Sequence, residues 1–124
     1  MGTSIVRVLV VDDYEPWRRF VFSALQKRPE LEIVGEASDG LEAVQKAREL
    51  RPDMILLDVG LPTLNGIEAA RQLHRFAPES RILFVSQESS ASVVQEALST
   101  GACGYVVKAS ASDLLSAVNA VLAA

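Results

Sequence analysis

Short apolar runs alternate along the chain with segments in which apolar residues recur every three or four positions. Runs of this kind are typical of strands buried on both faces of a parallel sheet, and the second spacing is typical of amphipathic helices. The alternation repeats five times in 124 residues. We therefore predict five strands, at residues 5–11, 31–37, 54–57, 82–86 and 103–108.

A helix is predicted after each strand. The first has an apolar face formed by Trp17, Phe20, Val21, Ala24 and Leu25. The second and third begin with capping signals, in Asp39-Gly40-Leu41-Glu42 and Asn65-Gly66-Ile67-Glu68. The fourth is predicted at 90–100, before Gly101, and the last follows 110–113.

This order of elements favours one α/β domain. Right-handed crossovers place helices on both faces of a doubly wound sheet. We predict a flavodoxin-like fold in which a five-stranded parallel sheet of order 2-1-3-4-5 is covered by five helices. The single domain spans 1–124, with its core at 5–123.

Polar side chains stand where the predicted strands end. Asp12 and Asp13 follow the first strand, and Asp58 follows the third. Ser86 and Lys108 end the fourth and fifth strands. Because ligands of open parallel sheets bind beyond the carboxyl ends of the strands, we expect these five side chains to meet.

The acidic residues indicate cation chemistry. Two carboxylates about 5 Å apart repel each other by about 3 kcal/mol at an effective dielectric near 20, and a divalent cation relieves that repulsion. Oxygen ligands favour Mg²⁺, whereas a zinc site is not expected because Cys103 and His74 are the only residues of their types. Asp58, on the central strand, is the best placed carboxylate to attack phosphorus and form an aspartyl phosphate.

Four of these features together resemble a known family. They are Asp12-Asp13, Asp58-Val59-Gly60-Leu61-Pro62, Ser86 and Gly104-Tyr105-Val106-Val107-Lys108. In this order they resemble the receiver (CheY-like) domain of two-component response regulators. Residues 34–40 and 101–105 resemble more narrowly the NarL/FixJ-like subgroup of LuxR-type helix-turn-helix regulators.

The resemblance implies a role for each residue of the site. Asp58 would accept a phosphoryl group from a sensor histidine kinase in a reaction that needs Mg²⁺, for which Mn²⁺ can substitute. Besides Asp58, the metal ligands would be Asp13 directly, Asp12 mainly through water, and Gly60 through its backbone carbonyl. Lys108 would bind a phosphoryl oxygen.

The resemblance also implies a switch. Ser86 would turn toward the phosphoryl group and Tyr105 would follow it inward, changing the surface formed by the fourth helix, the fifth strand and the fifth helix. Gly60, Gln87 and Glu88 occupy positions that would tune access and phosphoryl lifetime. Homodimer formation on phosphorylation is left open.

Two residues depart from the family pattern. Gln87 stands where a small residue is usual, and it would narrow access to Asp58. Ala109 follows Lys108, where many receivers have a cis proline. We expect the Lys108–Ala109 bond to be cis, although this costs about 3–4 kcal/mol before a residue other than proline.

Several residues have ordinary structural interpretations. Cys103 is predicted to be a small buried hydrophobe and Trp17 a partly buried helix residue. His74, the pair Arg18-Arg19, and Arg71 are predicted to lie on solvated helix faces.

Other functions are weaker or stay open. The sequence lacks the glycine-rich phosphate loop of a nucleotide hydrolase, and the acidic loop after the first strand would repel a flavin phosphate. A phosphatase of the haloacid dehalogenase type has an acid two residues after its nucleophile, where this chain has Gly60. A receiver fold that acts as a phosphorylation-independent protein-interaction module stays open.

Composition limits the partners. The net charge of −4 argues against direct nucleic-acid binding by this domain, so DNA would be contacted only through an output domain absent from this chain. Neither a signal peptide nor a membrane segment is evident, and a single cysteine suits a cytoplasmic protein. We expect no enzyme activity beyond self-phosphorylation and self-dephosphorylation.

Overall fold

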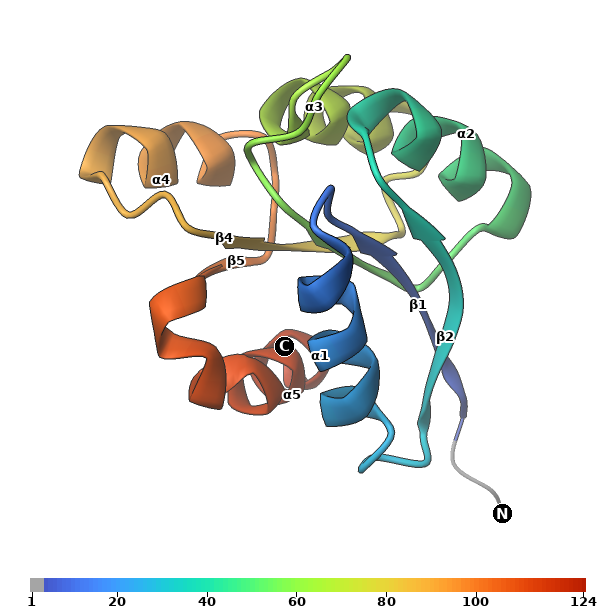
Figure 1. The fold of residues 1–124 in the computed structure, drawn as a ribbon. Helices are drawn as coiled ribbons and strands as arrows, with labels where there is room; N and C mark the ends of the chain where they lie inside the picture. Colours follow the sequence, from blue (N-terminus) through green and yellow to red (C-terminus); the bar gives the residue numbers. More distant parts are fainter. Residues whose placement is uncertain (1–3) are drawn as a thin grey trace.

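A parallel sheet lies between two layers of helices in the computed structural model, which describes residues 4–124 (Figure 1). The strands are β1 (Val6–Val11), β2 (Leu31–Ala37), β3 (Met54–Leu57), β4 (Arg81–Ser86) and β5 (Gly104–Val107). The helices are α1 (Glu15–Leu25), α2 (Gly40–Leu50), α3 (Gly66–Phe76), α4 (Ala91–Leu98) and α5 (Leu114–Ala123), with a 3₁₀ segment, η1 (Lys108–Asp113), before α5.

The strand order is β2-β1-β3-β4-β5, as predicted. All four pairings are parallel, and the register aligns the strand ends. Val11 of β1 pairs with Leu57 of β3, so the residues that follow them, Asp12 and Asp58, leave the sheet side by side. Ser86 of β4 pairs with Val107, which directly precedes Lys108.

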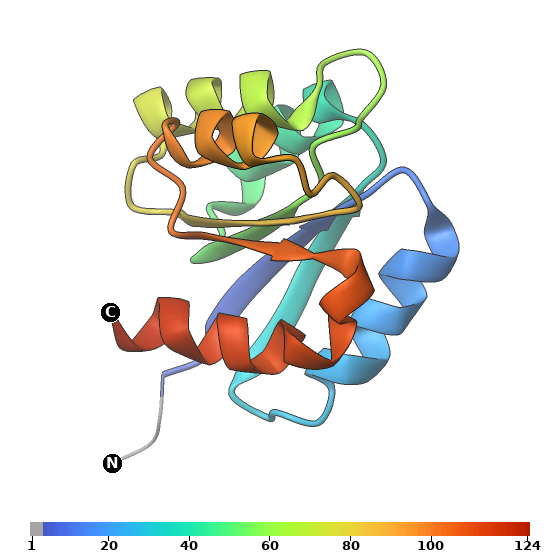
Figure 2. The same cartoon turned by 90° about the vertical axis from the view of Figure 1, so that its left-hand side faces the viewer.

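The sheet has a separate apolar core on each face. Helices α2, α3 and α4 cover one face, and α1 and α5 cover the other, as two views of the molecule show (Figures 1 and 2). The first core contains Phe84 and Leu73, and the second contains Val10 and Val118. Two packed faces leave the carboxyl edge of the sheet as the place where polar side chains gather.

The predicted helix starts are confirmed in detail. The Asp39 side chain accepts a hydrogen bond from the Glu42 amide at 2.7 Å, and the Glu42 carboxylate accepts one from the Ser38 amide at 2.8 Å. Asn65 caps α3 by accepting a hydrogen bond from the Glu68 amide at 2.9 Å. Both helices therefore begin where the sequence signals indicated.

Several predictions need correction. Cys103 is exposed rather than buried, because it stands one residue before β5, outside the sheet. Phe20 is 42% exposed, since the core-facing side of α1 is centred on Val21 and Leu25. The Lys108–Ala109 bond is trans, like every peptide bond between residues 4 and 124. The trans form is favoured before alanine, and Lys108 reaches the acidic residues with it.

Among the helices described here, none has the length and apolar character needed to cross a bilayer.

Candidate functional site

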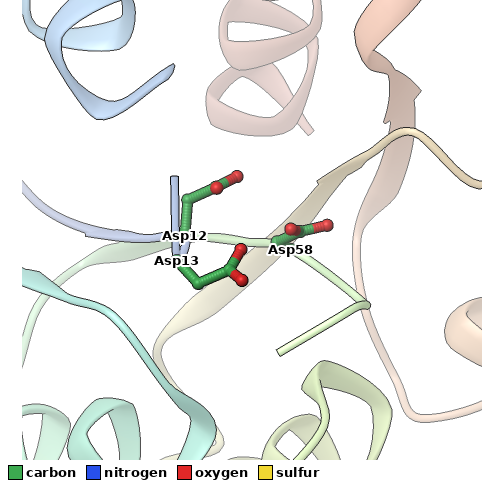
Figure 3. Close-up of side chains that lie close together, drawn as sticks. All are labelled: Asp12, Asp13 and Asp58. Carbon is green, nitrogen blue, oxygen red and sulfur yellow. The ribbon is translucent and has the colours of Figure 1, made fainter. Parts of the chain in front are cut away.

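Three carboxylates meet at the carboxyl edge of the sheet. Asp12 and Asp13 follow β1 and Asp58 follows β3, and each offers a carboxylate oxygen within 4.8 Å of the others (Figure 3). Asp12 and Asp58 are buried, with exposed fractions of 1% and 7%, whereas Asp13 is exposed. The predicted convergence of the acidic residues is therefore present in the structure.

A pocket of about 530 Å³ opens over this cluster. It is lined by Asp13, Tyr14, Asp58, Gly60, Ser86, Gln87, Glu88 and Lys108. All but Tyr14 were selected from the sequence. Tyr14 was missed because nothing in its type or spacing distinguishes it from an ordinary loop aromatic.

Asp12 lies deepest in the cluster. Its Oδ1 accepts a hydrogen bond from the Tyr14 amide at 2.9 Å, and its Oδ2 lies 2.6 Å from the Lys108 ammonium. Oδ2 is buried and accepts no well-aligned hydrogen bond from the residues described, and the close Lys108 ammonium is its stabilising partner. Burial raises the pKa of Asp12, and the contacts with Lys108 and Tyr14 oppose that shift only in part.

Lys108 connects the acidic residues to α1. Its ammonium is 3.6 Å from Oδ2 of Asp58, farther than from Asp12, and 5.0 Å from the centre of the Trp17 ring. Trp17 is partly buried, as predicted. The amine therefore already offsets part of the carboxylate repulsion, and it stands within reach of a group bound to Asp58.

Ser86 and Tyr105 both contact the backbone of Glu88. The buried Ser86 hydroxyl accepts a hydrogen bond from the Glu88 amide at 3.2 Å, and the Tyr105 hydroxyl donates one to the Glu88 carbonyl at 2.7 Å. The Tyr105 ring stacks on Phe84 with centroids 6.0 Å apart, and burial raises the pKa of its hydroxyl. The two side chains predicted to act as a switch are thus linked through a single residue.

The loop from β3 to α3 is packed tightly behind Asp58. Gly66 donates its amide to the Val59 carbonyl at 2.8 Å, and a Cβ on Gly66 would lie 1.8 Å from the Asp58 carbonyl oxygen. Gly60 is open by contrast, since a Cβ added there would have no atom of the described residues within 4 Å. Gly66 therefore sets how closely α3 approaches the acidic site.

Arg18 is the second residue of the site region that sequence reasoning misjudged. Its side chain is 16% exposed rather than solvated, and it hydrogen-bonds Glu36 and the Asp12 carbonyl. Its location one helical turn after the acidic loop was the available signal. His74 and Arg71 follow their predictions more closely, since His74 is exposed and Arg71 forms exposed ion pairs with Glu68 and Glu96.

The donor set fits a hard divalent cation. The clustered ligand atoms are carboxylate oxygens, which suit Mg²⁺ or Mn²⁺ rather than zinc. The buried Asp12 oxygen without an aligned donor, together with the repulsion among three carboxylates, would be relieved by such an ion. The pocket leaves room beside the carboxylates for water or phosphate oxygens.

Comparison with protein families identifies the family to which this fold belongs. Residues 8–119 match the response regulator receiver domain. The chain belongs to this family. It is a receiver domain of the kind found in two-component response regulators, as the resemblance of its motifs indicated.

Individual relatives agree with this assignment. The chain is 43% identical over 110 residues to a protein-glutamate methylesterase/protein-glutamine glutaminase of Thermotoga maritima, covering 87% of this chain and 32% of that protein. It is 36% identical to the transcriptional regulatory protein DegU of Brevibacillus brevis, covering 89% of this chain and 47% of DegU. The receiver domain therefore spans about a third to a half of these relatives.

A solved structure supports the predicted subgroup. A LuxR-family two-component response regulator from Aurantimonas superposes with a TM-score of 0.91 at 34% identity, covering 97% of this chain and 86% of that one. The similarity to the LuxR-type regulators, predicted from residues 34–40 and 101–105, is thus confirmed.

Proposed function

We propose that this receiver domain accepts a phosphoryl group on Asp58 from a phosphohistidine of a sensor histidine kinase. One arrangement supports the proposal most strongly. The Asp58 carboxylate lines an open pocket, within 4.8 Å of two further carboxylates and 3.6 Å from the Lys108 ammonium. A carboxylate nucleophile beside a cation-binding cluster and an amine suits phosphoryl transfer.

The transfer is a simple exchange of bonds. An oxygen of the Asp58 carboxylate attacks phosphorus, the bond from phosphorus to the donor imidazole nitrogen breaks, and the electron pair stays on that nitrogen. A bound Mg²⁺ ion, or Mn²⁺ in its place, would neutralise phosphoryl oxygens. Asp12, Asp13, Asp58 and the Gly60 carbonyl would hold it.

Lys108 would change partners in the reaction. Its ammonium lies 2.6 Å from Asp12 and 3.6 Å from Asp58, so only a small movement separates the two contacts. A phosphoryl group on Asp58 carries more negative charge than the carboxylate that it modifies. We expect Lys108 to move toward a phosphoryl oxygen, and Asp12 would then be neutralised as one of the residues that would hold the cation.

The signal would pass through Glu88. Ser86 accepts from the Glu88 amide, so turning its hydroxyl toward a phosphoryl oxygen breaks that contact. Tyr105 donates a hydrogen bond to the Glu88 carbonyl, and it would move inward as the segment from Ser86 to Glu88 shifts. The surface of α4, β5 and α5 would then change its population between two arrangements, as phosphorylation switches do.

The output of the whole protein is a separate proposal. DegU is a transcriptional regulator, and the chain covers only about half of it. We infer that this domain controls transcription through an output domain outside this sequence, which would be the part that binds DNA. Phosphorylation would promote homodimer formation through the α4, β5 and α5 surface.

Intact mass after incubation with a small phosphoryl donor tests the proposal. We expect a single phosphoryl adduct on the wild-type chain in the presence of Mg²⁺, and its loss with EDTA or in Asp58→Asn. Asp53→Asn is the matched control, because Asp53 immediately precedes β3, at the end opposite Asp58. That variant should keep the adduct.

The contrary result would favour the alternative function. A folded chain that binds Mg²⁺ and gains no adduct would point either to access blocked by Gln87 or to a phosphorylation-independent interaction module. Gln87→Ala separates limited access from lack of reactivity, since Gln87 is an exposed residue of the pocket wall. An adduct that forms only in Gln87→Ala would indicate that Gln87 blocks the donor.

A further inference from the structure

Arg18 links three parts of the fold beside the acidic cluster. It lies in α1, and its Nε donates to Oε1 of Glu36 in β2 at 2.8 Å. Its Nη1 donates to the backbone carbonyl of Asp12 at 2.7 Å. One guanidinium therefore ties the start of the acidic loop to β2, with little freedom to reorient because its planar fork is engaged at two points.

The Asp12 carbonyl belongs to the peptide unit that joins Asp12 to Asp13. The orientation of this unit sets the direction in which each of the two carboxylates leaves the backbone. The Asp12 amide on the other side is fixed by the Ala37 carbonyl at 3.0 Å. With Arg18 on the carbonyl, Asp12 is held on both sides, whereas the exposed Asp13 has no comparable burial to position it.

Glu36, the partner of Arg18, is itself held in place by several contacts. Its carboxylate pairs with Arg18 and Arg19, and its backbone carbonyl accepts a hydrogen bond from Lys46 of α2. Hydrogen bonding to Arg19 and Arg18 lowers the pKa of Glu36. The carboxylate therefore stays ionised at neutral pH and keeps its hold on Arg18.

Arg19 is a natural control for Arg18. Both arginines pair with the same Glu36 oxygen, so both contribute to the charge network on this side of the sheet. Arg19 is 52% exposed, lies over the Phe22 ring at 4.5 Å, and within residues 4–124 its side chain donates to Glu36 rather than to the acidic loop. In their hydrogen bonds the two arginines thus differ by the contact of Arg18 with the Asp12 carbonyl, and Arg18 is also the more buried side chain.

We propose that Arg18 is a positioning residue for the metal site, acting through the Asp12 carbonyl on the direction of the Asp12 and Asp13 carboxylates. The proposal rests on Mg²⁺ binding by the acidic cluster, which is part of the function proposed above. Removing a residue that orients metal ligands typically weakens metal affinity by about 10- to 100-fold. We expect about a tenfold increase in the Mg²⁺ dissociation constant of Arg18→Gln, the lower end of that range.

Isothermal titration calorimetry with Mg²⁺ tests this on the wild type, Arg18→Gln and Arg19→Gln. The dissociation constant should rise in Arg18→Gln and stay within about twofold of wild type in Arg19→Gln, a small loss of the kind expected for an exposed charge. In phosphorylation assays the Mg²⁺ concentration for half-maximal rate should rise in Arg18→Gln, while the rate at saturating Mg²⁺ stays unchanged. A general loss of structure would instead lower the rate at saturating Mg²⁺ as well as the Mg²⁺ affinity.

Arg18→Lys keeps the test decisive if Arg18→Gln does not fold. Lysine retains the charge but cannot donate to both acceptors in the fixed geometry of a guanidinium. The Mg²⁺ affinity of Arg18→Lys should therefore lie below that of Arg19→Gln. Equal affinities of the folded Arg18 variants and Arg19→Gln would overturn the proposal. Absence of Mg²⁺ binding by the wild type would instead refute the metal site itself, a result that is separate from the role of Arg18.

Discussion

At the scale of single residues, Asp12 is a carboxylate of the site whose ionised form is disfavoured by burial. Its side chain is buried, its Oδ2 accepts no aligned hydrogen bond from residues 4–124, and its closest cation there is the Lys108 ammonium at 2.6 Å. Burial raises the pKa of Asp12 because it disfavours the ionised form, and Asp58 adds to the shift. Without a bound metal, the ionised form of Asp12 is therefore less favourable in the folded protein than in the unfolded chain.

Asp12→Asn should stabilise the protein in EDTA at neutral pH. The raised pKa means that ionisation of Asp12 opposes folding, and asparagine removes that ionisation. We expect an increase of about 1 kcal/mol in the free energy of unfolding, or about 4 °C in Tm for a domain of this size. Thermal unfolding followed by circular dichroism measures the shift, with the exposed Asp13→Asn as control. A Tm below that of wild type would mean that the pair with Lys108 outweighs burial.

The same variant has a defined pH signature. The native protein takes up the Asp12 proton at a higher pH than the unfolded chain, so this group adds stability as the pH falls through its native pKa. The gain is complete below the ordinary pKa near 3.8, and it is lost as the pH rises. Glu36 acts in the opposite sense, because its lowered pKa gives stability that disappears in acid. The difference in Tm between Asp12→Asn and wild type should therefore shrink as the pH is lowered.

Sequence reasoning found the reactive side chains and missed some of their surroundings. Asp58, Ser86 and Lys108 could be selected because each follows an apolar run at a strand end. The meeting of Lys108 with the acidic residues was expected from their strand ends. The partly buried position of Arg18 depends on the packing of α1 beside β2, which no local pattern encodes. Cys103 was misjudged for the related reason that one residue separates a buried strand from an exposed loop.

At the scale of elements, the site depends on how closely α3 approaches the end of β3. The Gly66 amide bonds the Val59 carbonyl, and the space that a side chain on Gly66 would need is filled by the backbone of Asp58. The position begins a helix, where alanine is intrinsically better than glycine by about 1 kcal/mol. Any destabilisation by alanine there must therefore come from the close approach.

Gly66→Ala should destabilise the protein by about 3 kcal/mol, the upper part of the range for overpacking, since a Cβ would stand 1.8 Å from the Asp58 carbonyl oxygen. Gly60→Ala is the matched control, because no atom of the described residues lies within 4 Å of its added methyl group, and it should stay within about 0.5 kcal/mol of wild type. Urea denaturation measures both variants. Equal stability of the two would show that the β3–α3 loop adapts, and that Gly66 does not fix the position of Asp58.

The elements themselves were largely predictable. Strands 31–37 and 54–57 were predicted with the bounds that the structure has. The second is a fully apolar run that ends at Asp58, whereas the first, which contains Glu32 and Glu36, lies between the turn residues 29–30 and 38–40. The strand order was predicted from the common order of flavodoxin-like doubly wound sheets, and the structure confirms it. The segment η1 was not predicted, since Lys108–Asp113 contains no periodic apolar pattern, and its helical turns depend on the start of α5.

At the scale of the whole molecule, four strands and their loops each contribute to one charged edge. Two apolar cores on opposite faces of the sheet fix the strands, so the buried Asp12 and Asp58 cannot separate to relieve their repulsion without disturbing packed residues. One carboxylate oxygen of each of the three Asp side chains lies within 4.8 Å of the others. Stability of the fold and affinity of the site for cations are therefore coupled.

Mg²⁺ should consequently raise the stability of the entire domain. A ligand that binds only the folded state, present at ten times its dissociation constant, adds about 1.4 kcal/mol by mass action, or about 5 °C in Tm for a domain of this size. Thermal unfolding in MgCl₂ and in NaCl of equal ionic strength distinguishes binding from screening, because monovalent salt weakens the same repulsion without occupying the site. Asp13→Asn removes a proposed ligand from the exposed side of the cluster and should abolish most of the Mg²⁺ effect while leaving the NaCl effect. Equal shifts in the two salts would mean that the edge is merely acidic, and the proposed metal site would have to be abandoned.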